Sequence, residues 1–468
     1  MFERLKSWLS DGSTATIDLA KAAPPPSPLA PVDLTDAAQV SAVMDLAARI
    51  GDVLLHSGTG NNDAKAQIHA VASAYGLHYC HVDITLNTIT IFTHMGQERQ
   101  PISVFRVVRR LSVDFSKLAS VDRLIRSIQA GATPPDVAVQ TLDEIMASPP
   151  PFGFNTSLVG WGGLAAAVAI LLGGGPVVSV ISFFVGVVIM AGVAWLDSKR
   201  LPPFFQNMYG GFVATMPAAV AYQIAQSGGI NLSPGQIIGS AIIVLVAGLT
   251  LVQAIQDGIT GAPVTASARF FEAMMMTGGI VAGVGLGMEL SSAIGIALPT
   301  NEGAQLSGFA TATAKVISGA FASASFAMAC YSEWGSIIIS GLTALVGSMI
   351  YYYLLLPLGV GPVVSTAIAA TAIGLAGGLL ARRFMIPPLI TAIAGITPLL
   401  PGLTIYRGMY AMMHDQMLLS YTLLVVALAV SSALAAGVVL GEWIARKLRR
   451  PPTFNPYKAL RRRRQSPF

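Results

Sequence analysis

The sequence predicts a polytopic α-helical membrane protein with a small N-terminal α+β domain. The first observation is an apolar stretch from about residue 154 to 443, in which charged residues come only in small clusters. Of the 468 residues, 53% are hydrophobic and 11% are charged, whereas soluble domains carry about 25% charged residues. The second observation is that residues 36–150 have a normal charged content and amphipathic patterns. We therefore expect a lipid-embedded body joined to an aqueous head.

Residues 1–35 are expected to be a disordered tail, because the stretch 22–31 is rich in proline and lacks helical periodicity. No secretory signal peptide is expected, since residues 1–10 lack a long apolar core. The two cysteines, Cys80 and Cys330, do not make a disulfide framework.

Residues 36–150 are expected to form the cytoplasmic α+β domain. Apolar residues three to four apart predict a helix over 40–54, which ends at a Gly-rich turn. Asp63 is expected to cap the next helix, which stops at Gly76. Three strands and two helices are expected to follow: strands at 81–86, 89–93 and 102–108, with a turn at Asn87-Thr88, and helices at 115–130 and 135–146.

Ten membrane spans are expected in the apolar body, because each crossing needs about 20 apolar residues. Short Gly/Pro turns separate many of them. An alternative folds the first two into one re-entrant hairpin. The expected spans are 157–174, 176–196, 204–226, 235–255, 268–290, 306–329, 335–356, 360–381, 384–401 and 418–441.

Positive charge orients this body with the head and the C-terminal tail in the cytoplasm. The net charge of +5 comes mostly from the basic tail, 446–468, which is also suited to contact anionic lipids. With that orientation, Arg407 is the strong cation left outside. The other loop cations then lie inside, and these are Lys199, Arg200, Arg269, Arg382 and Arg383.

Ten spans divide into two transmembrane halves of five, residues 155–300 and 301–445. The stretch 247–250 (Ala-Gly-Leu-Thr) in the fourth span matches 394–397 (Ala-Gly-Ile-Thr) in the ninth, although chance explains a match of this length equally well. Because five is odd, the second half would be inverted in the membrane. A five-plus-five inverted repeat is typical of secondary transporters, whereas no Walker A motif points to ATP as the energy source.

Three stretches across residues 38–445 form a pattern by their order and spacing. They are 55–60 (Leu-His-Ser-Gly-Thr-Gly) with the helix end 74–77, 256–261 (Gln-Asp-Gly-Ile-Thr-Gly) with 267–273, and 400–408 (Leu-Pro-Gly-Leu-Thr-Ile-Tyr-Arg-Gly). This pattern resembles the threonine/serine exporter (ThrE) family. The resemblance implies ten spans, a cytoplasmic N-terminal domain and export of small hydroxy amino acids by an ion gradient. No cofactor is expected.

Two stretches depart from the family pattern. Residues 61–67 replace a basic-plus-acidic pair at the start of the second head helix, and residues 251–254 replace a Pro-Gly near the first break. These departures leave the identity of the substrate and any chemistry in the head open.

A threonine or serine zwitterion needs partners for a carboxylate and an ammonium, and the ends of broken helices supply both. The expected breaks are Asp257-Gly258 and Pro401-Gly402. Asp257 is expected to bind the ammonium or to carry a proton. The alternative for Asp257 is a helix cap at the inner surface.

Two further positions are candidates for the substrate and ion pathway. Arg269 and Glu272 share a helix face and are expected to pair, with a purely structural ion pair as the alternative. Arg407 is suited to attract a carboxylate at the outer mouth. The alternative for Arg407 is an interfacial anchor together with Tyr406.

Lys315 lies inside the sixth expected span, where a charged residue costs about 2.5–3.5 kcal/mol on insertion scales. It is expected to titrate during transport or to substitute for a bound cation. The alternative is that it snorkels to the outer face beside Glu289 or Glu302.

The head holds five of the six histidines. His78, Cys80, His81 and Asp83 have the residue types of a metal site, but their spacing matches no established zinc pattern, so no metal is expected.

The leading hypothesis is a secondary transporter, not an enzyme, that exports threonine, serine or similar small metabolites across a bacterial inner membrane, driven by the proton motive force. One alternative is a membrane-anchored hydrolase that acts through the head, and another is a channel or scaffold with a regulatory head. The expected partners are the amino-acid substrate, protons and the lipid bilayer. Nucleic acid is not expected, and a homo-oligomer stays open.

Overall fold

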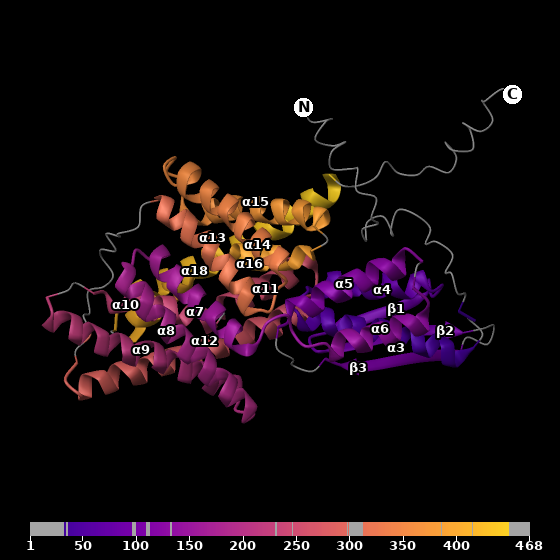
Figure 1. Ribbon diagram of the computed structural model, residues 1–468, viewed down its shortest axis with the longest axis horizontal. Helices are drawn as coiled ribbons and strands as arrows, with labels where there is room; N and C mark the ends of the chain where they lie inside the picture. The colour runs from indigo at the N-terminus through magenta and orange to yellow at the C-terminus, as the bar shows by residue number, and fades with distance from the viewer. Residues whose placement is uncertain are drawn as a thin grey trace, which may run out of the picture. The chain divides into compact units, whose positions relative to one another are not determined.

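The computed structural model divides into two compact units, drawn in Figure 1. The head unit consists of Met1–Val113, Lys117–Pro149 and Trp443–Phe468, and the membrane unit consists of Asp114–Ser116 and Pro150–Glu442. The expected N-terminal tail lies almost entirely outside the described residues. The structure describes residues 32–33, 36–95, 100–108, 113–131, 133–229, 232–245, 247–296, 298, 312–384, 386–413 and 415–448.

Three antiparallel strands form the sheet of the head unit in the order β1-β2-β3. They are β1 (Cys80–Thr85), β2 (Thr88–Met95) and β3 (Gln100–Val107), close to the ranges that alternation predicts. Thr85 pairs with Thr88, so the first turn consists of Leu86 and Asn87, one residue earlier than expected. Leu86 has a φ of 49°, the left-handed conformation that two-residue hairpin turns require.

Four helices precede and follow the sheet in the chain. The prediction that Asp63 caps the second helix was wrong. The capping residue is Gly60, whose backbone is extended, and Asp63 lies in the first turn of the helix. The other helix bounds agree with the expected ranges to within a few residues. The helices are α3 (Ala37–His56), α4 (Asn61–Ala74), α5 (Phe115–Gln129) and α6 (Pro135–Ala147).

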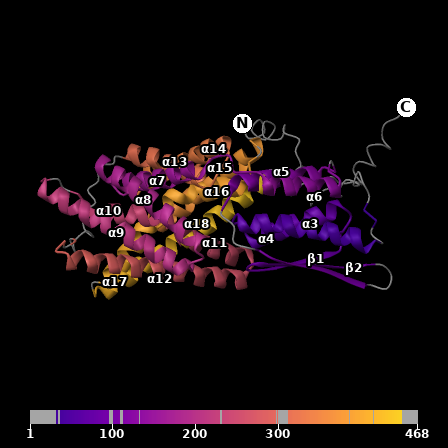
Figure 2. The same cartoon turned by 60° about the horizontal axis from the view of Figure 1, so that its bottom comes forward.

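The core of the head unit lies between its sheet and the helices on one face of it. Helix α3 packs on β2 and β3, and α4 packs on β1, as Figure 2 shows. Ile89 and Ile91 of β2 are fully buried beneath these helices. On the opposite face of the sheet, the ring of His81 stacks on Phe92 with 4.9 Å between centroids.

The first half of the membrane unit contains three unbroken helices, a broken one and a very long one. The break is a 3-10 turn, η1, of three residues. In order these are α7 (Phe154–Leu171, 18 residues), α8 (Pro176–Ser198, 23), α9 (Pro203–Ser227, 25), α10 (Pro234–Ile242, 9) with η1 (Ile243–Leu245) and α11 (Ala247–Thr260, 14), and α12 (Pro263–Ala293, 31).

The second half repeats this order with nearly the same lengths. Its broken helix also has nine residues before a three-residue 3-10 turn. In order these are α13 (Ala312–Ala329, 18 residues), α14 (Trp334–Met349, 16) with the π-helical turn η2 (Ile350–Leu355, 6), α15 (Pro362–Arg383, 22), α16 (Pro388–Ile396, 9) with η3 (Thr397–Leu399) and α17 (Gly402–Met413, 12), and α18 (Met417–Leu448, 32).

Six helices in the described part of the chain are long and apolar enough to cross a membrane, or seven if α10 and α11, bent by 49°, count as one. The chain is therefore a multi-pass membrane protein. Helices α7 and α8 each meet this criterion alone, which favours two crossings over one re-entrant hairpin. Helix α18 extends to Leu448, so Arg446 and Lys447, expected in the tail, lie in its last turn.

Two of the expected spans were wrong as continuous crossings. The fourth, 235–255, is interrupted by η1. In the ninth, 384–401, the apolar helix runs only over Pro388–Leu399, which is about 18 Å of helix against a hydrocarbon core of about 30 Å. Pro398 and Pro401 lack backbone N–H donors, so the helical hydrogen bonds cannot continue there.

Each half contains one pair of helices whose backbones touch through glycine. A Cβ added at Gly283 of α12 would overlap the carbonyl of Met208 on α9, and one added at Gly441 of α18 would overlap the carbonyl of Thr371 on α15. Only residues without a side chain fit such an approach, as in other tightly crossing membrane helices. The same holds for Gly211 and Gly279 in the first pair and for Gly374 and Gly437 in the second.

Candidate functional site

The first helix break lies earlier in the chain than expected. Asp257 and Gly258, expected at the break, lie inside α11, whereas the break is at η1, Ile243–Leu245. Gly258 does not interrupt the helix, because α11 continues beyond it to Thr260. The helix ends only where Gly261 adopts a φ of 95°.

The second helix break is at Pro401-Gly402, as expected. After η3 the backbone of Leu400 is extended, with φ −62° and ψ 137°, and α17 begins at Gly402. The N–H of Ile405 donates to the carbonyl of Pro401 at 3.0 Å, so Pro401 is the residue from which the new helix starts. Pro401 and Leu400 are both buried.

The two breaks lie against each other, and the contact is reciprocal. A Cβ placed on Gly248 would lie 3.9 Å from the Cβ of Leu400. A Cβ placed on Gly402 would lie 3.3 Å from the Cδ1 of Ile243. A glycine beside each break therefore contacts a residue of the other break.

The register of the two halves follows from these breaks. Residues 248–250 and 402–404 both read Gly-Leu-Thr, and each begins three residues after the end of its 3-10 turn. The match expected from sequence, 247–250 with 394–397, was out of register, because residues 394–397 come before the second break.

Two helix N-termini and two helix C-termini come together where the breaks meet. Helices α11 and α17 begin there, so their first N–H groups have no carbonyl partner within the helix, and α10 and α16 end there in 3-10 turns, where the carbonyls of Ala241 and Ala394 accept backbone N–H groups. Such ends carry partial positive and partial negative charge. The arrangement offers both signs of charge without a charged side chain.

Asp257 and Arg269 form a buried ion pair between α11 and α12. The Arg269 Nη1 lies 2.6 Å from the Asp257 Oδ2. The side chain of Asp257 is 1% exposed and that of Arg269 is 13% exposed. Arg269 therefore has an acidic partner across the turn, Asp257, that the sequence did not predict. The pair ties the end of the broken helix to the long helix that follows it.

Lys315 and Arg407 lie apart from this ion pair in the chain. The Lys315 Nζ lies 5.7 Å from the ring centroid of Tyr352, a cation–π geometry. Its expected partner Glu289 is exposed, and Glu302 lies outside the described residues. Arg407 is half-buried in the second turn of α17.

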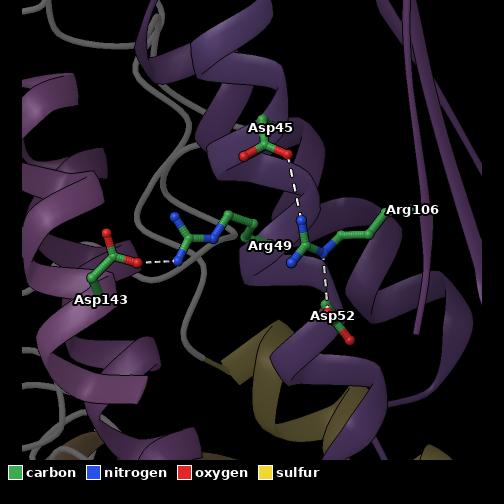
Figure 3. Close-up of polar contacts among 5 residues, drawn as sticks. All are labelled: Asp45, Arg49, Asp52, Arg106 and Asp143. Atoms are coloured by element: carbon green, nitrogen blue, oxygen red, sulfur yellow. Dashed lines mark hydrogen bonds and ion pairs between the residues drawn. The ribbon is translucent and has the colours of Figure 1, made fainter. Parts of the chain in front are cut away.

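A charged network joins three elements of the head unit, shown in Figure 3. The Nε of Arg106 on β3 lies 3.0 Å from Asp52, and its Nη1 lies 3.4 Å from Asp45. Arg49, on the same face of α3, pairs with Asp143 of α6. Since these side chains are partly exposed, the network mainly fixes the position of α3 against β3 and α6.

The histidines of the head do not gather around a common point. Within the described residues, no group of three or more His, Cys, Asp or Glu side chains is placed to hold a metal ion. The thiol of Cys80 is buried, and burial raises its pKa. The hydroxyl of Ser57 donates to the carbonyl of Val53 at 2.8 Å, so this serine ends helix α3.

Three buried serines, Ser332, Ser336 and Ser340, were missed as candidates from sequence. Serine is common throughout the apolar body, so the sequence gives no sign of which hydroxyls are satisfied. Ile243, Gly248 and Leu400 were also missed, because nothing in an apolar run marks a contact between two breaks.

Comparison with known proteins gives matches along nearly the whole chain. The family model described as "Putative threonine/serine exporter" matches residues 45–291, and the one described as "Threonine/Serine exporter, ThrE" matches residues 315–444. The "Threonine/serine exporter" of Corynebacterium glutamicum is 61% identical over 458 residues, which are 98% of this chain and 93% of the relative. The "Probable threonine/serine exporter" of Mycobacterium tuberculosis is 35% identical over 413 residues, which are 87% and 77%. No solved structure matches.

Proposed function

The chain belongs to the threonine/serine exporter family, and from this we propose that it is a secondary transporter that exports threonine, serine or similar small amino acids. Its relatives carry the name of exporters of these two amino acids. The structural observation that carries the proposal is the reciprocal contact of the two broken helices. Broken helices that meet are the usual form of a substrate site in secondary transporters.

The membrane unit is proposed to cross the bacterial inner membrane ten times as two inverted halves, residues 155–300 and 301–445. The matching lengths of the two sets of helices support this, since each half places its broken helix fourth. The head, residues 36–150, and the C-terminal tail are proposed to lie in the cytoplasm, because that places Lys199, Arg200 and the other loop cations inside.

The substrate is proposed to bind where the breaks meet. The partly positive starts of α11 and α17 suit its carboxylate, and the partly negative ends of α10 and α16 suit its ammonium. Pro401 and Gly402 would border it.

The charged candidates are proposed to lie along the pathway, away from this centre. Asp257 with Arg269, and next to them Gly258 and Glu272, would form its cytoplasmic end. Lys315 and Arg407 would lie towards the outside, where Arg407 would attract the carboxylate of a leaving amino acid. The proton motive force is proposed to drive export.

The proposal is tested by counterflow of labelled threonine and serine in proteoliposomes that contain the purified chain. We expect exchange of both amino acids, and net movement when a pH gradient is imposed. Exchange of labelled alanine and glutamate is measured in the same way and defines the substrate range. If none of these amino acids exchanges faster than in liposomes without protein, the proposed function is wrong.

Replacing Gly402 by valine is expected to reduce threonine counterflow at least tenfold while the protein stays folded. A Cβ there would lie 3.3 Å from Ile243, and the two methyl groups of valine would fill the space between the breaks. Gly335→Val is the matched control, because a Cβ at Gly335 would meet nothing within 4 Å. Counterflow by Gly402→Val at the rate of the control would place the substrate elsewhere.

A further inference from the structure

Three serine hydroxyls along one side of α14 are buried and have no hydrogen-bond partner among the described residues. Ser332 is 0% exposed, Ser336 is 1% exposed and Ser340 is 0% exposed. Ser336 and Ser340 are on α14, and Ser332 comes two residues before it. Because Ser336 and Ser340 are four residues apart on α14, they lie above one another on the same face of the helix, and Ser332 is in the turn that leads into it.

Buried hydroxyls without partners are costly, at about 1–3 kcal/mol each. A serine or threonine within a helix usually avoids this by donating to the carbonyl one turn earlier. Thr343 of the same helix does so, to the carbonyl of Ile339 at 2.7 Å. Three unsatisfied hydroxyls in a row therefore point to a polar ligand that the protein itself does not supply.

The first half of the membrane unit offers a direct comparison. Ser182 is the seventh residue of α8, and its hydroxyl accepts a hydrogen bond of 2.8 Å from Ser240, the seventh residue of α10. Ser340 is likewise the seventh residue of α14, but the seventh residue of α16 is Ala394. The second half therefore keeps the hydroxyl and lacks its partner.

The other two serines also differ from the first half. The residues that correspond to Ser336 and Ser332, counted from the helix start, are Val178 and Gly174. Neither of these has a polar side chain. The row of three hydroxyls is therefore specific to the second half, and close packing of the repeat does not require it.

The row of serines points towards the second helix break. Thr343 continues it, and a Cβ on Gly395 of α16 would lie 3.6 Å from the Cγ2 of Thr343. A Cβ on Gly319 of α13 would contact both Ser348, further along α14, and Pro398 of η3, the latter at 3.6 Å. The face of α14 that carries Ser336 and Ser340 thus leads to α16, the helix that ends at the second break.

The spacing of the hydroxyls fits water. Positions four residues apart on a helix are about 6 Å apart along its axis. Two O–H···O hydrogen bonds of about 2.8 Å span nearly this distance, so one water molecule can bridge Ser336 and Ser340. A single water needs two or more polar partners to be stable when buried, and this arrangement supplies them.

We propose that Ser332, Ser336 and Ser340 line a file of water molecules through which protons reach the second helix break. The end at Ser332 lies in the turn between α13 and α14, and the end at Ser340 is three residues before Thr343. Its direction, from the cytoplasm inwards, rests on the proposed function. The file itself is a property of the fold and does not.

The first test asks whether water reaches these positions. Ser332→Cys, Ser336→Cys and Ser340→Cys are made singly in the full chain with Cys80→Ala and Cys330→Ala, and silver ions are added to the purified protein. Silver reacts with a thiolate, which forms where water is present. The thiols left unreacted are then counted with a maleimide dye after denaturation.

Two control positions make this test quantitative. Ser182→Cys replaces the corresponding serine that has a partner, and Ile338→Cys lies on α14 at a residue that is 60% exposed to the lipid side. We expect silver to block the cysteines at positions 336 and 340 at least tenfold faster than either control. Equal rates at positions 340 and 182 would overturn the water file, whether or not the chain transports amino acids.

The second test concerns protons. With Ser336→Ala and Ser340→Ala combined, the ratio of pH-driven threonine movement to threonine counterflow is expected to fall at least tenfold. An unchanged ratio would overturn the proton pathway. A wild-type chain that shows no counterflow would instead contradict the proposed function, and the silver test would still decide on the file.

Discussion

Replacing Arg269 by methionine is expected to remove most of the folded protein, because it leaves the carboxylate of Asp257 buried without its cation. That carboxylate is 1% exposed and lies 2.6 Å from Arg269. Removing one partner of a buried ion pair costs about 3–5 kcal/mol, which is comparable to the whole stability of many domains. The measurement is the melting temperature of the purified protein in detergent, together with the fraction that elutes as one species.

Two controls show whether the buried charge causes this loss. In the double variant Asp257→Asn with Arg269→Met, no charge remains buried, so most of the folded protein should return. Lys199→Met removes an exposed cation and should change stability by less than about 0.5 kcal/mol. If Arg269→Met melts at the temperature of the wild type, the ion pair does not hold α11 to α12.

The same double variant separates structure from transport. If it folds and exchanges threonine normally, the pair serves only to connect two helices. If it folds but does not exchange threonine, the charges take part in transport.

Gly283→Val is expected to prevent assembly of the first half of the membrane unit. A side chain at Gly283 would collide with the backbone carbonyl of Met208 on α9. Ordinary overpacking costs about 1–3 kcal/mol because side chains can move aside, but a helix backbone cannot do so without separating the two helices. We expect a yield of monodisperse protein at least tenfold below that of the wild type.

Gly278→Val is the matched control on the same helix. A Cβ at Gly278 would lie 3.9 Å from the ring of Phe204, an ordinary contact distance. The two variants introduce the same β-branched residue into α12, so they share any loss of helix propensity. Similar yields from both would show that the backbones of α9 and α12 are not in contact.

The sequence predicted helix boundaries well wherever proline or glycine marks them. Helices α6, α8, α9 and α10 begin with proline at the first helical position, and their expected starts agree to within a residue. Proline fits this position because the first N–H of a helix has no partner in any case. The second break was predicted for the same reason, since Pro401 cannot continue a helix.

The first break could not be found in this way. Its residues are Ile243, Val244 and Leu245, which look the same as the interior of any membrane helix. What interrupts the helix there is the second half of the protein, which brings Leu400 and Gly402 against it. A contact between residues so far apart in the chain has no local pattern.

The candidate site was predicted in part for similar reasons. The contact of Arg269 with Asp257 was missed because spacing on one helix is visible in sequence, whereas the turn that brings Asp257 to Arg269 is not. The role of Ser340 depends on its lacking a partner, and this in turn depends on an alanine in another helix. In each case the amino-acid sequence contains the residues but does not show which of them lie side by side in the fold.

The contacts between helix backbones at glycine also determine which parts of the membrane unit can move. Where two backbones touch, there is no layer of side chains in which one helix can slide past the other. Helix α9 with α12, and α15 with α18, should therefore each move as a rigid body during a transport cycle. The two broken helices do not touch backbone to backbone at Gly248 and Gly402, and the area of their contact there is small. It is suited to be the pivot on which the two rigid bodies rock.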